Sequence, residues 1–326
     1  MRFLIQGLGS IGRRHLAAVR SAFPDSQPII WRHGGGEIPD GAVGVCSLEE
    51  ALAAKPDAAI IATPAPFHLA AAMGLAEAGV PLLVEKPLSA TLGGVESLGD
   101  ILAENDVILR VGYCLRETKV VKCLQSALGR LGGLRQARFT VGQHLADWRP
   151  GTDYRNGISA RIDRGGGALL ELSHEIDLAL LLTGLPDTVS AQLDMGTHLG
   201  LPVEEAANLV LERPGFMATV MLDFWSRPAH RAGWIEGENG RLSYDFLAGR
   251  VTFDAGRQSD VLLDGANIET DELLSDQLRA FVGVISGDAD GLCQLDEAAH
   301  VLSVIDAARL SAVLEAKPKP LHGWPL

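Results

Sequence analysis

The stretch FLIQGLGSIGRRH, residues 3–15, decides the fold expected for this chain. Residues 3–6 are typical of a short buried strand, and Gly7, Gly9 and Gly12 follow in G-x-G-x-x-G spacing. The first glycine permits a tight turn, the second lets the backbone approach a pyrophosphate, and the third lets the next helix pack closely on the strand. The stretch therefore predicts a βαβ unit that binds a dinucleotide.

The first third of the chain alternates apolar strands with helix-like stretches, as in a doubly wound parallel sheet. Ser10 and Ile11 lie where the first helix is expected to start, and free N–H groups at that point would face the dinucleotide phosphates. Strands are expected at 3–6, 28–32, 58–62, 82–85 and 107–112, and helices at 11–22, 47–54, 67–78 and 92–105. We therefore expect an α/β chain whose residues 1–118 form a Rossmann domain with a parallel sheet.

The pattern changes after about residue 117, where strand-like stretches become dominant. Strands are expected at 136–141, 188–192, 208–212, 217–225, 233–236, 241–245 and 250–253, and helices at 120–128 and, strongly apolar, 168–182. Two further helices, at 271–286 and 296–314, are expected to close this part. Residues 119–326 are thus predicted to form an α+β domain on a mostly antiparallel, open sheet.

Composition and charge exclude several classes of function. The chain has 326 residues, and its 28 basic and 41 acidic residues give a net charge of −13 without a basic run that could follow a nucleic acid backbone. No apolar run has the length of a membrane span, so we expect a cytoplasmic protein. The four cysteines form no C-x-x-C pair, which favours reduced thiols over a metal site or a disulfide framework.

The second expected strand ends in Arg32 and His33, and Arg32 lies 20 residues beyond Gly12. NAD-binding folds usually carry Asp or Glu at this distance, where it binds the adenosine ribose hydroxyls. A cation at that point favours the 2′-phosphate of NADP, so NADP(H) is the favoured cofactor. NAD(H) stays possible if Arg32 is simply a solvated residue at the end of the strand.

The next two strands also end in residues suited to a site. The third leads into Thr63, Pro64 and His68, and the fourth leads into Glu85 and Lys86, followed by a proline. Ligands of open α/β sheets bind at the carboxyl ends of the strands. We therefore predict that these five residues contact the cofactor, although an ordinary exposed loop lysine is the alternative for Lys86.

Four motifs together resemble the glucose-fructose oxidoreductase, inositol dehydrogenase and rhizopine-catabolism oxidoreductase family (Gfo/Idh/MocA). They are GLGSIGRRH at 7–15, ATPAPFH at 62–68, GVPLLVEKPLS at 79–89 and GGGALLELSHEIDLALLLTG at 165–184. The resemblance implies hydride exchange between a nicotinamide and a sugar, polyol or related carbon. It also implies that Lys86 lies by the nicotinamide, that His174 lies opposite, and that the open sheet forms a homodimer or homotetramer.

The residues of the last motif support a catalytic site independently. Glu171, His174 and Asp177 recur at i, i+3 and i+6 in an otherwise apolar helix, and buried charges are costly unless they are paired or used. We predict that His174 and Asp177 are catalytic with Lys86, and the alternative is a core histidine tied to Asp177. Family members commonly have an acid four residues before the histidine, where this chain has Leu170, so direct substrate contact by Glu171 stays open.

The polar and aromatic segment at 144–161 is expected to lie over the cleft. Trp148 and Tyr154 could stack on a sugar ring, and Arg149 and Arg155 could bind a carboxylate or phosphate. Arg116, near the domain junction, is a further candidate for contact with an anion. A surface loop or an oligomer contact is the alternative for the segment, and a solvated linker residue is the alternative for Arg116.

The expected activity is that of an NAD(P)-dependent sugar oxidoreductase, with His174 as proton acceptor and the Lys86 ammonium stabilising the alkoxide. Resemblance to members associated with amino-sugar and surface-polysaccharide pathways indicates a nucleotide-linked or acidic sugar. A cofactor-sensing protein on the same fold, and a sugar enzyme without net redox change that recycles its bound NAD, are the alternatives.

Overall fold

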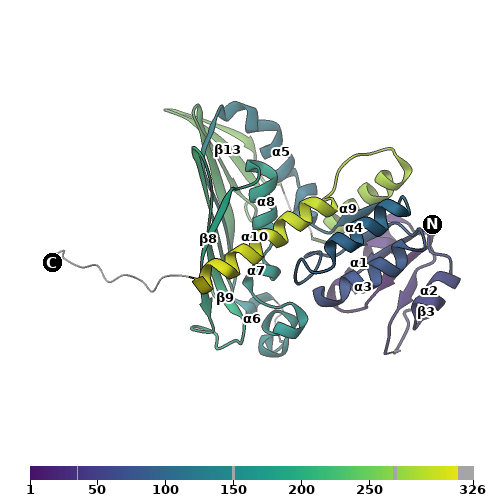
Figure 1. Ribbon diagram of the computed structural model, residues 1–326. Coiled ribbons are helices and arrows are strands. Elements are labelled where there is room, and N and C mark those ends of the chain that lie inside the picture. Colours follow the sequence, from purple (N-terminus) through teal and green to yellow (C-terminus); the bar gives the residue numbers. More distant parts are fainter. Residues whose placement is uncertain (35, 149–150, 267–269, 315–326) are drawn as a thin grey trace.

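The computed structural model describes residues 1–34, 36–148, 151–266 and 270–314. Its two sheets stand side by side, and helix α10 (Leu295–Leu314) runs between them (Figure 1). The expectation of a parallel α/β domain followed by a mostly antiparallel one is confirmed. The boundary at residue 118 stays a prediction.

The first sheet is parallel throughout, with strand order β3-β2-β1-β4-β5-β6. Its strands are β1 (Phe3–Gln6), β2 (Ile29–Trp31), β3 (Val43–Val45), β4 (Ala58–Ile61), β5 (Leu82–Val84) and β6 (Leu109–Val111). The order reverses between β1 and β4, so the carboxyl ends of these two strands flank a crevice where ligands bind in such folds. Strand β3 was not predicted.

The helices that cover this sheet are α1 (Ser10–Ala22), α2 (Leu48–Ala53), α3 (His68–Ala76) and α4 (Val95–Glu104). Helix α9 (Thr270–Ser286) joins them, since its Leu278 and Phe281 pack in one core with Phe3 and Ile5 of β1. The expectation that this helix closes the second domain is therefore wrong. Its apolar face instead covers residues of the first sheet.

The second sheet has the order β14-β13-β12-β11-β7-β10-β9-β8, and only the pair β7 and β10 is parallel. Its strands are β7 (Leu134–Gly142), β8 (Thr188–Met195), β9 (Glu204–Arg213), β10 (Phe216–Asp223), β11 (His230–Gly237), β12 (Gly240–Asp245), β13 (Arg250–Ala255) and β14 (Gln258–Leu263). Helices α5 (Lys119–Ala127), α8 (His174–Thr183) and α10 pack on one face, while the other face carries no helix in Figure 1.

The apolar helix predicted at 168–182 is two helices, α7 (Ala168–Glu171) and α8, separated at Leu172 and Ser173. The Ser173 hydroxyl accepts a hydrogen bond from Tyr113 at the break, with an oxygen to oxygen distance of 3.3 Å. The break makes His174 the first residue of α8. It thereby moves His174 from the middle of a helix to a helix N-terminus.

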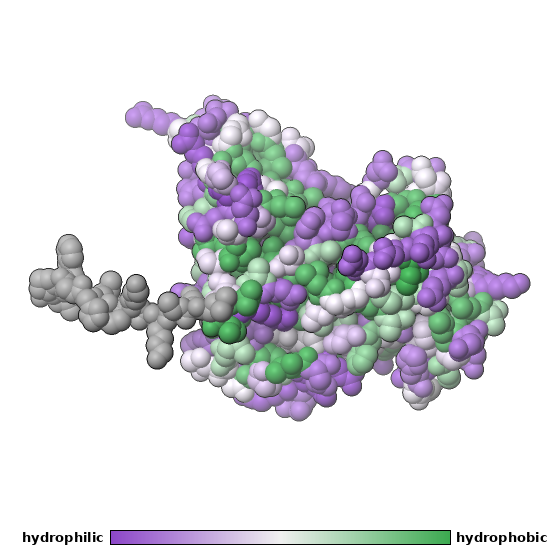
Figure 2. Space-filling view, viewed as in Figure 1, coloured by the Kyte–Doolittle hydropathy of each residue, from purple (hydrophilic) through white to green (hydrophobic). Residues whose placement is uncertain are grey.

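The surface in Figure 2 mixes hydrophilic and hydrophobic residues over the viewed face. Among the helices of the described ranges, none has both the length and the apolarity needed to cross a bilayer.

Candidate active site

The three glycines of the first turn lie in different surroundings. A Cβ atom on Gly7, whose φ is +90°, would lie 2.9 Å from the Ala62 carbonyl oxygen, and one on Gly12 would lie 2.1 Å from the Gly7 carbonyl oxygen. Gly9 instead faces open space, with no atom within 4 Å of such a Cβ. Helix α1 begins there without a side-chain cap or an acidic residue in its first turn. The turn therefore offers open space beside Gly9 and the positive end of a helix dipole at the same place, where a pyrophosphate would bind.

A cavity of about 330 Å³ adjoins this turn and gathers residues from both domains. Predicted site residues in its wall are Gly9, Ser10, Ile11, Thr63, Pro64, Glu85, Lys86 and Glu171. Most of the residues predicted to bind a dinucleotide thus surround one space, which fits a nicotinamide cofactor. Arg14 and Arg164 also line it, and neither was predicted.

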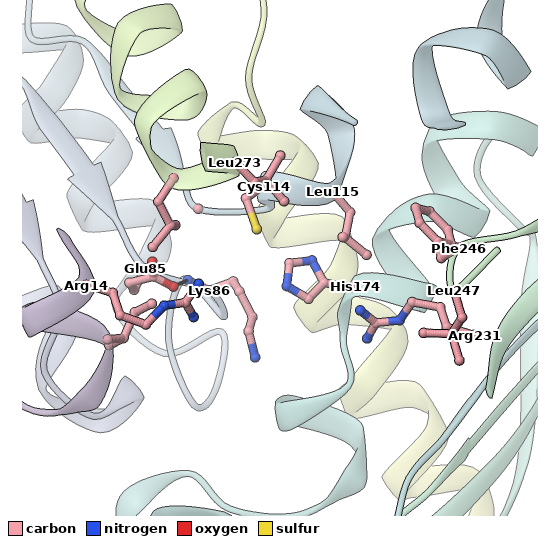
Figure 3. Close-up of a pocket in the computed structure, with 13 residues that line it drawn as sticks. Arg14, Glu85, Lys86, Cys114, Leu115, His174, Arg231, Phe246, Leu247 and Leu273 are labelled. Carbon is pink, nitrogen blue, oxygen red and sulfur yellow. Dashed lines mark hydrogen bonds between the residues drawn. The ribbon is translucent and has the colours of Figure 1, made fainter. Parts of the chain in front are cut away.

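A second cavity, of about 380 Å³, shares Ile11, Arg14, Glu85 and Lys86 with the first. His174 and Arg231 complete its polar wall, and Figure 3 shows Lys86 and His174 directed toward the same space. Lys86 therefore lies at the junction of the two cavities.

Lys86 also spans the two domains. Its Nζ donates a hydrogen bond to the backbone carbonyl of Glu171 at 2.7 Å, and the Glu171 carboxylate accepts one from the Ser159 hydroxyl, also at 2.7 Å. The helix break after α7 leaves this carbonyl near Lys86. The ammonium is thus fixed at the cavity junction by the second domain.

His174 is largely buried at the start of α8, with its ring edge-on to Tyr113 at a centroid distance of 5.5 Å. Burial lowers the pKa of His174 well below its usual value, and the positive charges of Lys86 and Arg231 lower it further. The imidazole is therefore neutral near pH 7, and its Nδ1 has no hydrogen-bond partner in the described part of the chain. A neutral imidazole facing a cavity can accept a substrate proton.

His68 lies behind the site rather than in it. Its side chain is 1% exposed, and its ring nitrogens lie 2.7 Å from the Thr63 carbonyl oxygen and 3.0 Å from that of Pro87. Burial lowers its pKa, although both carbonyls oppose this. The ring joins the turns after β4 and β5, and it lines neither cavity, so cofactor contact by His68 stays a prediction.

Asp177 and Arg116 form a buried ion pair away from both cavities. Asp177 is 0% exposed, and its oxygens accept hydrogen bonds from Nε and Nη2 of Arg116 at 2.6 to 3.1 Å. Nη1 of Arg116 donates to Glu297 at 2.7 Å. Burial raises the pKa of Asp177 to about 6, against the opposing effect of Arg116. The polar atoms of the two residues satisfy each other, and neither residue lines the two cavities, so the catalytic role of Asp177 and substrate contact by Arg116 gain no support here and stay predictions.

The aromatic segment forms a pocket of its own. Trp148 and Tyr154 line a separate space of about 210 Å³, and the Arg155 guanidinium lies 4.6 Å from the Tyr154 ring centroid. None of the three lines either cavity described above. Arg149 lies outside the described residues. Sugar contact by this segment stays a prediction.

Arg32 and His33 lie just beyond β2, the strand next to β1. Nη1 of Arg32 donates to the Glu37 carbonyl at 3.1 Å, and the His33 ring lies 5.2 Å from that of Trp31. Neither residue lines the two cavities. Their place beside the first strand suits the adenosine end of a dinucleotide, and their role stays a prediction.

Sequence reasoning missed Arg231, which comes from β11 of the second sheet. Its Nε lies 2.8 Å from Oε1 of the buried Glu175, and Nη2 donates more weakly to Glu175 Oε2 at 3.4 Å. Nothing in the local sequence sets Arg231 apart, since it lies in an ordinary strand. Arg14 could have been found, because it belongs to the GRRH end of the glycine motif.

The comparisons with known proteins agree with this geometry. Residues 1–113 match the family model of an oxidoreductase family with an NAD-binding Rossmann fold, which defines the class of the chain. Residues 125–243 match the C-terminal domain model of the same family. The chain therefore belongs to the Gfo/Idh/MocA family of oxidoreductases.

Two curated relatives are named as a reductase and a dehydrogenase of nucleotide-linked sugars. The dTDP-3,4-didehydro-2,6-dideoxy-alpha-D-glucose 3-reductase of Streptomyces violaceoruber is 27% identical over 75% of this chain and 72% of its own length. The UDP-N-acetylglucosamine 3-dehydrogenase of Acidithiobacillus ferrooxidans is 31% identical over 54% of this chain and 55% of its own length.

Solved structures share the whole fold at low identity. A levoglucosan dehydrogenase in complex with NADH and levoglucosan has a TM-score of 0.82 at 18% identity, covering 96% of this chain and 97% of that one. The WlbA dehydrogenase of Bordetella pertussis, in complex with NADH and UDP-GlcNAcA, has a TM-score of 0.78 at 20% identity over 96% of both chains. At these identities the likeness establishes the fold alone.

Proposed function

We propose that this protein is a dehydrogenase or reductase that transfers hydride between a nicotinamide cofactor and a CH–OH carbon of an acidic or nucleotide-linked sugar. The single observation that carries the proposal is the shared wall of the two cavities. Lys86 lies where the dinucleotide cavity meets the cavity that contains His174. A hydride donor and acceptor must meet at such a junction.

The cofactor, when bound, supplies the hydride chemistry, and the protein supplies position and charge. Gly9 and the N–H groups of Ser10 and Ile11 would hold the pyrophosphate, since the helix start there is uncapped by any side chain. Arg32 favours NADP(H), while NAD(H) remains the alternative.

Lys86 and His174 divide the work at the reacting carbon. The Lys86 ammonium, held by the Glu171 carbonyl at 2.7 Å, is proposed to hydrogen-bond the substrate oxygen and stabilise its negative charge as the hydride leaves. The neutral His174 ring accepts the hydroxyl proton, and in the reverse direction it returns that proton. Exclusion of water by the apolar wall around Phe246 and Leu273 strengthens both interactions.

An anionic substrate is supported by the charges around the second cavity. Arg14, Lys86 and Arg231 line it, and Glu85 is the one acidic side chain among the described residues of its wall, while the buried Glu175 pairs with Arg231. The curated relatives named above act on nucleotide-linked sugars, which carry phosphate charge. A carboxylate or phosphate therefore suits this cavity better than a neutral sugar does.

The open face of the second sheet is the proposed surface of a homodimer or homotetramer. Met217 and Met221 of β10 are each 42% exposed there, on the face opposite to the helices. Light scattering of the purified protein tests this, and a monomer at micromolar concentration would contradict it.

The catalytic proposal is tested by following reduced-nicotinamide absorbance with NAD⁺ or NADP⁺ and a panel of inositols, aldoses, uronic acids and nucleotide-linked amino sugars. Lys86→Ala should lower turnover by about 10²-fold or more while cofactor affinity, measured by nicotinamide fluorescence, changes little. The exposed Lys119→Ala serves as the matched control and should retain full turnover. Full activity of Lys86→Ala would refute the assignment.

A further inference from the structure

A buried hydrogen-bonded pair of side chains connects the glycine-turn helix to the residue before Lys86. His15, on α1, is 0% exposed, and its Nε2 lies 2.6 Å from Oε1 of Glu85 at the end of β5. The two residues are 70 positions apart in the chain. The pair therefore joins the element that begins the cofactor site to the element that carries Lys86.

The Glu85 carboxylate is held on several sides. Its second oxygen, Oε2, accepts the backbone N–H of Lys86 at 3.1 Å. Gly112, beyond β6, packs closely against the same side chain, because a Cβ there would lie 3.3 Å from Cα, Cδ and Oε1 of Glu85. The carboxylate is thus confined by His15, the Lys86 amide and Gly112.

Glu85 carries its negative charge in this setting. Burial raises the pKa of its carboxyl, but the hydrogen bond and charge of His15, with the charges of Lys86 and His68, outweigh this and lower it overall. Cys114, which also lies nearby, has its pKa raised to about 12 by burial and stays neutral. The ionised Glu85 accepts a hydrogen bond from His15 Nε2 and lines the cavities beside Lys86.

A purely structural role would be served better by apolar residues, since burying an ionised carboxylate and an imidazole costs desolvation that hydrophobic side chains of similar volume avoid. Glu85 moreover lines both cavities, whereas His15 lines neither. The pair is therefore placed to act on the site through Glu85.

We propose that the contact between His15 and Glu85 positions Lys86. The contact fixes the end of β5 against helix α1, so that the distance between the glycine turn and the Lys86 ammonium stays constant. The inference rests on the proposed function for the part that concerns turnover. His15 is a positioning residue, because it acts through Glu85 and contacts neither cavity.

Two substitutions of similar volume at His15 test the pair. His15→Gln keeps a donor that can reach Glu85, and we expect its kcat to stay within about threefold of the wild type. His15→Leu removes the donor, and we expect kcat to fall by about tenfold or more while KM for the sugar stays within about threefold. Thermal unfolding of both variants is measured alongside. Equal kcat values for the two variants would overturn the proposal.

A second measurement needs no turnover and so separates this inference from the proposed function. The rate of amine labelling at Lys86 is followed by mass spectrometry at one fixed pH in protein without cofactor, for the wild type and His15→Leu. Loss of the His15 contact should change the labelling rate of Lys86 by about threefold or more, because the end of β5 is then no longer fixed against helix α1. The same change should leave the exposed Lys119 unaffected. An unchanged labelling rate at Lys86 would refute the positioning role even if the enzyme assay succeeds.

Discussion

Replacing Arg116 with methionine is expected to destabilise the fold strongly without altering either cavity wall. The guanidinium donates to Asp177 through Nε and Nη2 and to Glu297 through Nη1. Methionine removes every one of these donors and leaves the Asp177 carboxylate, which is 0% exposed, without its partner. The stability lost by the variant is thus the free energy of keeping a buried charge without a partner.

The size of the effect follows from this loss. Breaking a buried ion pair by removing one partner costs about 3–5 kcal/mol. The entropy of unfolding is about 2.1 cal/mol/K per residue, or roughly 0.7 kcal/mol/K for the whole chain, if it unfolds as one unit. The melting temperature of Arg116→Met should therefore fall by about 4–7 °C at pH 8.

The loss of stability in Arg116→Met should depend on pH in a defined direction. Burial raises the folded-state pKa of Asp177 to about 6, above its unfolded value, so its contribution to stability is greatest at low pH and declines as the pH rises through about 6. Without Arg116 that pKa rises further, and the decline extends to higher pH. Wild type and variant should therefore differ less at pH 5, where both carry a protonated Asp177, than at pH 8.

The assay is scanning fluorimetry at both pH values, with two comparison variants. Asp177→Asn should lose less stability than Arg116→Met, because Arg116 keeps Glu297 and its guanidinium can still donate to the amide oxygen. The double variant should be more stable than Arg116→Met alone, since the unpaired carboxylate is gone. If Arg116→Met loses less than about 1 kcal/mol of stability, or loses the same amount at both pH values, the reasoning is refuted.

Three further substitutions test the cofactor site. Gly9→Ala should weaken cofactor binding in a fluorescence titration with little change in melting temperature, since its Cβ meets no protein atom within 4 Å. Gly12→Ala should instead destabilise the protein by about 1–3 kcal/mol, measured by denaturant unfolding, because its Cβ would lie 2.1 Å from the Gly7 carbonyl oxygen. Arg32→Asp should shift preference from NADPH toward NADH, and an unchanged ratio of dissociation constants would remove Arg32 from the site.

The fold was largely predictable because its signals are local. The glycine motif and the alternation of apolar strands with helices both lie within short windows of sequence. Strands β3 and β14 were missed, since each lies at a sheet edge and carries few buried residues to form a pattern. The placement of α9 was missed because an apolar helical face does not say which sheet it will cover.

The residues of the candidate site were predictable only where they belong to a sequence motif. Lys86 and His174 were found from motif position, and both line one cavity. Asp177 was assigned to catalysis because its spacing from His174 suggested a shared face, but its partner Arg116 lies 61 residues away and leaves no local signal. Arg231 was missed for the same physical reason, since only the folded sheet brings it to the cavity.

Arg231 and His174 together link substrate charge to proton transfer. The Arg231 charge is one of three causes that lower the pKa of His174, after burial and Lys86. A general base works best when its pKa lies near the working pH, so the lowered pKa makes His174 a weaker base than an ordinary histidine. A carboxylate or phosphate bound at Arg231 would offset that positive charge and raise the proton affinity of the imidazole. In the proposed reaction, an anionic substrate would thus strengthen His174 as a base, whereas a neutral sugar of the same shape would leave its pKa as low as before.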